Sequence, residues 1–269
     1  MQILIATDGS PEADLAVRLG GEIQKQVEGT VMLLTIIQQP DERPQAEAIL
    51  LRAQTLLPQG MAQTKIRLGD VAEEIVTEAQ LGRYQLTVMG EKPPHGLMGR
   101  LLAPTPERVI SHISGPVLLA RGAVRPLQRI LVCESGREPS LLNRLMTQLS
   151  PLLQAVDELT ALHVMSQIAA APGVRGWELR ASADELMEKH TIEGNLLEAD
   201  LARLVKLNLN LQAKVRHGMV VREILDEMQT GDYDLVVIGA HQGKGWERFL
   251  LDDLAHELMR HADRPLLVI

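Results

Sequence analysis

A glycine-rich and basic stretch in the first half of the chain has residue types suited to binding phosphate. It contains Gly90, Lys92, His95, Gly96, Gly99 and Arg100. Glycine lets backbone N–H groups approach a phosphate oxygen closely, and cationic side chains offset its charge. The same residue types also occur in solvated loops and tight turns, so both interpretations stay open here.

Two other patterns could suggest chemistry but have the wrong spacing or too few partners. His256 and His261 flank a glutamate but stand five residues apart, so they do not share a helix face as zinc ligands would. Cys133 is the chain's one cysteine, at the end of an apolar run, and we interpret it as a small core residue. We expect no metal site and no catalytic residue.

A repeat in the sequence predicts the helices and strands that position these residues. Residues 67–91 recur as residues 216–240, shifted by 149 positions. Each copy reads as a glycine turn, an amphipathic helix, a second glycine turn, a buried strand and a final glycine. Their acidic pairs, Glu73–Glu74 and Asp226–Glu227, are interpreted as solvated helix faces.

Apolar runs bounded by turn residues predict ten strands. They are Gln2–Ala6, Thr30–Ile37, Ala62–Leu68, Gln85–Met89, Pro116–Ala120, Ile130–Cys133, Glu158–Met165, Leu211–Arg216, Asp234–Ile238 and Leu266–Ile269. Helices are predicted between them, among them Gln45–Leu57, Ser140–Ala155, Ala183–Lys189 and Leu196–Leu207. Alternating strands and helices favour an α/β class with two tandem, doubly wound, five-stranded parallel sheets in the order 3-2-1-4-5, with helices on both faces.

The repeat also predicts the domain organisation. We expect one domain at residues 1–121, a linker at 122–129 and a second domain at 130–269. The offset between equivalent residues is 127 at Ile3/Ile130 and 149 at Gly69/Gly218, so the second domain carries 22 more residues, placed near 166–195. This insertion contains Trp177, which either packs on the sheet or contacts a protein partner.

Composition excludes several classes of function. The formal charge of −8 and an aromatic content of 2% argue against nucleic-acid binding. No apolar run is long enough to span a membrane, and a strand predicted from Gln2 leaves no room for a signal peptide. A single cysteine fits a reducing compartment, so we expect a cytoplasmic protein.

The order of elements, with ATDGS after the first strand and VMG…HGLMGRLL after the fourth, resembles the universal stress protein family over essentially the whole chain. In the ligand-binding branch of that family, an Asp after strand one contacts adenine and a G-x2-G-x9-G-[ST] run wraps the phosphates and ribose. The resemblance places Asp8 and Gly90 in these roles. Pro93, Ala103 and Pro104 replace later positions of the run, and the prolines cannot donate hydrogen bonds.

The second half departs further from the family pattern. Ser135 stands opposite Asp8; Gly239 keeps the first glycine, and Gly243 and Gly245 lie beyond the second position. Asp252 and Asp253 occupy the final positions, where carboxylates would repel phosphate. The resemblance therefore implies a degenerate second site. We expect either no cofactor, or ATP or AMP in the first half alone.

The resemblance implies a stress-adaptation protein that binds or regulates, more readily than a turnover enzyme. An adenine-nucleotide-binding protein with slow ATP hydrolysis, and a sensor that docks on a protein partner, are the alternatives. Family members commonly dimerise through strand five, so the two halves are expected to pair antiparallel through Pro116–Ala120 and Leu266–Ile269 as a pseudo-twofold intramolecular dimer, with further dimerisation possible.

Overall fold

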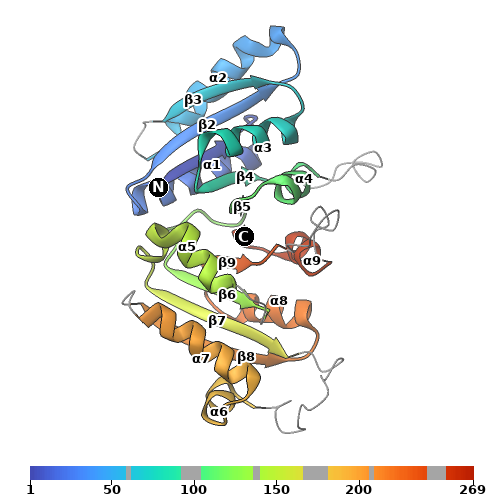
Figure 1. Cartoon of the computed structure of the whole chain (residues 1–269). Helices are drawn as coiled ribbons and strands as arrows, with labels where there is room; N and C mark the ends of the chain where they lie inside the picture. Colours follow the sequence, from blue (N-terminus) through green and yellow to red (C-terminus); the bar gives the residue numbers. More distant parts are fainter. Residues whose placement is uncertain (59–61, 92–103, 136–139, 166–180, 206–208, 241–252) are drawn as a thin grey trace. The chain divides into compact units, whose positions relative to one another are not determined.

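The structure is a computed structural model of the whole chain, and it describes all residues except 59–61, 92–103, 136–139, 166–180, 206–208 and 241–252. The chain forms two compact units (Figure 1). The first unit contains residues 1–126 together with the C-terminal segment 263–268. The second contains residues 127–239 and 253–262, with Ile269.

The first unit is built on a sheet in the order β3-β2-β1-β4-β5, as the sequence predicts. Its strands are β1 (Gln2–Ala6), β2 (Thr30–Ile37), β3 (Gln63–Leu68), β4 (Leu86–Gly90) and β5 (Val117–Ala120). All of these neighbours pair in parallel, with Ile3 opposite Leu86 in the central pair. β1 and β5 are almost wholly buried, which fits central strands covered on both faces.

Helices cover this sheet on both faces. They are α1 (Pro11–Gln26), α2 (Arg43–Thr55), α3 (Val71–Gly82) and α4 (Thr105–His112), with a short 3-10 turn, η1 (Pro40–Glu42), before α2. Right-handed crossovers put α1 and α2 on one face and α3 and α4, which contact each other, on the opposite face. The start of α1 follows its sequence: the Ser10 hydroxyl accepts a hydrogen bond from Ala13 N, and Pro11 occupies the first turn.

The second unit repeats the first four strands in the order β9-β6-β7-β8, all parallel. These strands are β6 (Arg129–Glu134), β7 (Glu158–Met165), β8 (Asn210–His217) and β9 (Leu235–Ile238). Its helices are α5 (Leu141–Leu153), α6 (Ala183–Glu188), α7 (Ile192–Leu204), α8 (Val220–Thr230) and α9 (Asp253–His261). α5 contacts α7, and α8 contacts α9, so helices again pack in pairs.

The last strand, β10 (Leu266–Val268), pairs antiparallel with β5 inside the first unit. Leu267 lies opposite Leu118, and both are 1% exposed. The predicted antiparallel pairing of these two strands is therefore confirmed. β10 covers the apolar edge that β5 would otherwise expose.

Each of the ten predicted strands is present with its ends within one residue of the prediction. Two helix predictions need correction. α2 begins at Arg43 because Pro44 is tolerated in a first helical turn. α7 begins at Ile192, four residues earlier than predicted, because the Thr191 hydroxyl caps it by accepting from Gly194 N at 3.0 Å.

The helix predicted at Ser140–Ala155 is present but interrupted. Leu149 has a non-helical conformation (φ −131°, ψ 35°), two residues before Pro151. Proline lacks the backbone donor and crowds the preceding turn, which accounts for the kink.

In the predicted insertion, Trp177 lies outside the described residues. The described part consists of α6 and the start of α7, and it packs through Leu186 on Met165 and Val215.

Candidate functional site

Asp8 lies at the carboxyl end of β1, beside the start of α1. Its side chain is exposed, and Oδ1 accepts a hydrogen bond from Ser10 N at 3.0 Å, which makes an Asx turn. Gly9 between them has φ 75°, a conformation that favours glycine. Asp8 therefore helps to form the turn that leads into α1. A carboxylate has four lone-pair sites and can accept several hydrogen bonds at once.

Gly90 ends β4, the strand next to β1 in the sheet. A Cβ atom built at Gly90 would lie 2.3 Å from the carbonyl oxygen of Glu12 and 2.8 Å from Ala13 N. The backbone of α1 therefore passes too close for any side chain at this position. Packing between α1 and β4 explains this glycine without a ligand.

We predict that Gly90→Ala destabilises the first unit by about 2–3 kcal/mol without any ligand, because the new methyl group meets rigid backbone. Gly115→Ala is the matched control, since a Cβ there meets nothing within 4 Å. Urea unfolding of both variants followed by circular dichroism measures the difference. Equal stability of the two variants would contradict the packing explanation.

The remaining first-half residues of the expected site fall outside the described ranges. These are Lys92, His95, Gly96, Gly99 and Arg100. At the described edge, the Arg121 guanidinium after β5 pairs with the Glu91 carboxylate after β4. The opposite charges of Arg121 and Glu91 therefore offset each other at the ends of these two strands.

The equivalent edge of the second unit has different chemistry. Ser135 is exposed after β6, and the preceding residue, Glu134, is 7% exposed. The Glu134 carboxylate accepts hydrogen bonds from Leu141 N at 3.2 Å and Leu142 N at 2.6 Å, so it caps the start of α5. In the first unit the neutral, buried Thr7 occupies the matching position. Gly239 follows β9 and Asp253 begins α9, whereas Gly243, Gly245 and Asp252 lie outside the described residues.

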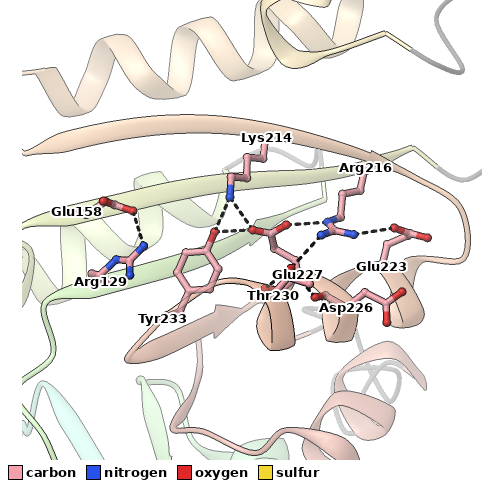
Figure 2. Close-up of polar contacts among 9 residues, drawn as sticks. All are labelled: Arg129, Glu158, Lys214, Arg216, Glu223, Asp226, Glu227, Thr230 and Tyr233. Atoms are coloured by element: carbon pink, nitrogen blue, oxygen red, sulfur yellow. Dashed lines mark hydrogen bonds and ion pairs between the residues drawn. The ribbon is translucent and has the colours of Figure 1, made fainter.

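A polar cluster on the outer part of the second-unit sheet was missed by the sequence interpretation. It comprises Lys214 and Arg216 from β8, Glu223 and Glu227 from α8, and Tyr233 just before β9 (Figure 2). The 4% exposed Glu227 accepts from Lys214 Nζ at 2.8 Å, Tyr233 Oη at 2.6 Å and Arg216 Nε at 2.7 Å. Arg216 also contacts Glu223 at 3.3 Å.

The first unit contains the same cluster 149 residues earlier, formed by Lys65, Arg67, Glu74, Glu78 and Tyr84. Glu78, 2% exposed, is 2.8 Å from Lys65 Nζ and 3.1 Å from Arg67 Nη1, and it accepts from Tyr84 Oη at 3.0 Å. The expectation that the acidic pairs form solvated faces is therefore wrong for Glu227. The repetition of all five residue types at one offset was the signal that could have found the cluster.

Hydrogen bonds set the charge state of the central carboxylates. Burial alone would raise the pKa of Glu227, but hydrogen bonds from Lys214, Tyr233 and Arg216 outweigh it, and the pKa is lowered. The pKa of Glu78 is lowered in the same way. Their stabilising contribution is present above the unfolded pKa of about 4.3 and is lost as pH falls through the folded value.

The pKa values of the two tyrosines shift in the opposite direction, upward. Burial, followed by the bond to Glu78, raises the pKa of Tyr84 to about 12, and burial followed by Glu227 also raises that of Tyr233. The chain has two tyrosines, so both report on the clusters. In each cluster two cations and a phenol contact one buried carboxylate, and a second carboxylate contacts the arginine. These contacts fasten a helix to the sheet rather than leaving a group poised for catalysis.

We predict that tyrosine absorbance at high pH titrates well above the unfolded midpoint of about 10 in the native protein, and near 10 in concentrated urea. The Tyr84 contribution to stability is present below about pH 10 and lost as pH rises to about 12. Tyr84→Phe should remove one of the two tyrosine components from the native titration. A native midpoint equal to the unfolded one would show that the clusters do not form.

Within the described residues, no group of three or more His, Cys, Asp and Glu side chains could hold a metal ion, and no helix is long and apolar enough to cross a membrane. Cys133 is half-buried in β6, and burial, with Glu134 and Glu227, raises its thiol pKa. That shift opposes formation of a reactive thiolate.

Two tandem units, each built on parallel strands with helices on both faces, define a doubled, doubly wound α/β fold. The Universal stress protein family profile matches residues 1–121 and 126–269, and the chain belongs to this family. No curated protein sequence matches the chain significantly.

Solved structures share the fold along the whole chain. A universal stress protein from Archaeoglobus fulgidus DSM 4304 matches with a TM-score of 0.71 and 16% identity, covering 99% of this chain and 95% of that chain. A functionally unknown protein from Pseudomonas aeruginosa PAO1 matches with a TM-score of 0.67 and 17% identity, covering 100% of this chain and 92% of that chain.

Proposed function

We propose that the protein is a cytoplasmic binding and regulatory protein of stress adaptation whose adenine-nucleotide site lies in the first half alone. The observation that carries the proposal is the exposed Asp8 carboxylate at the carboxyl end of β1. β1 and β4 are neighbours in the sheet. The strands that follow β1 in the chain, β2 and β3, lie on one side of this pair, and β5, which follows β4, lies on the other. Ligands of doubly wound sheets bind at the carboxyl ends of such strands.

The chemistry of Asp8 suits adenine. Its carboxylate accepts hydrogen bonds, and the exocyclic amino group of adenine donates them. Its bond to Ser10 N holds the carboxylate at the turn, so little conformational freedom is lost on binding. The glycines and cations among residues 90–100 would supply the contacts to phosphate.

The second half supports the proposed asymmetry. Its strand-one turn has the hydroxyl of Ser135 in place of the Asp8 carboxylate, and the neighbouring Glu134 adds a buried negative charge. This charge faces α5, because both oxygens accept from the backbone of that helix. A triphosphate near Glu134 would meet like charge.

Binding rather than turnover is favoured by the state of the ionisable groups. Glu78 and Glu227 are each held ionised by two cations and a tyrosine. General acid–base catalysis needs a group whose pKa is near the working pH, and hydrogen bonding moves these carboxylates away from it.

The test is calorimetric titration of the full chain with ATP and with AMP. We expect Asp8→Ala to weaken nucleotide binding by about tenfold or more, the loss expected for a charge-assisted hydrogen bond. Ser135→Ala is the matched control in the second half and should bind as the wild type does. Wild-type affinity in Asp8→Ala would refute the proposed site, and steady phosphate release from ATP would refute the non-catalytic role.

A further inference from the structure

The turn that carries Asp8 is held from α2 by one side chain, Arg52. Its Nη1 atom donates a hydrogen bond to the carbonyl oxygen of Gly9 at 3.1 Å. Its Nη2 atom pairs with the carboxylate of Asp14 in the first turn of α1. Arg52 therefore joins α2 both to the turn after β1 and to the helix that follows this turn.

The bond to Gly9 fixes the peptide group that also bonds to Asp8. The Gly9 carbonyl and the Ser10 N–H belong to one planar peptide unit, and in a trans peptide these two groups point in opposite directions. The carbonyl faces Arg52, and the N–H donates to Asp8 Oδ1 at 3.0 Å. Holding the carbonyl therefore orients the donor that holds the Asp8 carboxylate.

An apolar contact from α2 supports the same turn. A Cβ atom built at Gly9 would lie 3.1 Å from Ile49 Cγ1, so α2 packs directly on this residue. Ile49 and Arg52 are three residues apart and therefore share a face of the helix. Glycine populates positive and negative φ about equally, so the φ of 75° at Gly9 needs contacts that select it.

The chemistry of the polar contact suits an arginine. A guanidinium presents its donors in a fixed fork, so it can bond to a carbonyl and a carboxylate at once, whereas the ammonium group of lysine is a compact point charge. At the offset of 149 that relates β3 to β8, the apolar Leu201 of α7 stands at the position of Arg52. The second half therefore has no guanidinium at this position.

We propose that Arg52 is a positioning residue of the first-half site and sets its preference for adenine. It acts through the Gly9–Ser10 peptide, which holds the Asp8 carboxylate where it accepts from the exocyclic amino group of the base. The inference rests on the proposed function, because it assigns a role at the same site. It adds that recognition of the base depends on a side chain of α2, 43 residues from Gly9 in the sequence.

The test compares AMP with purine riboside monophosphate, which is AMP without the amino group, by calorimetric titration of the full chain. Asp8 gains a hydrogen bond from AMP alone, so Arg52→Met should weaken AMP binding by about threefold to tenfold and leave binding of the other nucleotide unchanged. Arg52→Lys keeps the charge without the fork and should bind AMP with intermediate affinity. Arg43→Met is the matched control on α2, since the Arg43 side chain is 67% exposed and bonds to Glu47 at 3.2 Å, and it should bind both nucleotides as the wild type does.

A measurement on the ligand-free protein tests the turn directly. Backbone order parameters of Gly9 and Ser10, from nuclear magnetic resonance relaxation, should be about 0.85 in the wild type and in Arg43→Met, and should fall toward about 0.6 in Arg52→Met. Wild-type order parameters in Arg52→Met, or an equal loss of affinity for the two nucleotides, would overturn the inference. Absence of AMP binding in the wild type would refute the proposed function instead, and the order parameters would then decide alone whether Arg52 holds the turn.

Discussion

Replacing Glu227 with glutamine is expected to lower the free energy of unfolding of the second unit by about 2–3 kcal/mol. Removing one partner of a buried ion pair typically costs about 3–5 kcal/mol, because the opposite charge stays buried and unpaired. Here the side chains of Lys214 and Arg216 are 42% and 27% exposed. Water can therefore solvate part of their charge, which places the cost at or below the lower end of that range.

Glu223→Gln is the control for the Glu227 substitution. The Glu223 side chain is 20% exposed and lies 3.3 Å from Arg216 Nη1, and the loss of this partly solvated pair should cost less than about 1 kcal/mol. Urea unfolding followed by circular dichroism measures both variants, fitted with one transition per unit. Equal costs would show that the buried carboxylate does not organise the cluster.

Replacing Leu267 with aspartate is expected to destabilise the first unit by about 4 kcal/mol or more. Leu267 is 1% exposed in β10, opposite the equally buried Leu118 of β5. The substitution loses the burial of a leucine, worth about 2–3 kcal/mol, and adds a carboxylate without a partner. Because β10 belongs to the first unit, the C-terminal substitution should weaken the N-terminal half of the chain.

Leu81→Asp is the matched control in the first unit. Leu81 is 69% exposed on α3, so this change should alter stability by less than about 0.5 kcal/mol. The two variants introduce the same side chain and differ in the environment that receives it. If Leu267→Asp unfolds at the same urea concentration as Leu81→Asp, β10 does not contribute to the stability of the first unit.

The strands could be predicted closely from the sequence because each is a short apolar run between turn residues. Val117–Ala120 is buried at every position, and its exposed edge would have been a liability, which is why its pairing with Leu266–Val268 could also be predicted. Helix starts were harder to predict. The cap at Thr191 and the proline in the first turn of α2 allowed both helices to begin before their apolar patterns did.

Partners distant in sequence could not be predicted from local pattern. Glu227 lies on a helix with other charged residues, so the local sequence predicts that it is solvent-exposed. In the structure, Arg216 and Lys214 of β8, eleven and thirteen positions earlier, bond to it. Likewise, the local sequence is equally consistent with Gly90 as a ligand contact and with Gly90 as a turn residue. Its reason is the approach of the Glu12 carbonyl, which only the packing of α1 reveals.

On the proposed function, one half of this doubled fold binds an adenine nucleotide and the other does not. Native mass spectrometry of the full chain with AMP counts the bound molecules directly. We predict one AMP per chain in the wild type and in Ser135→Ala, and none in Asp8→Ala at the same concentration. Two AMP molecules per chain, or one that persists in Asp8→Ala, would contradict the claim.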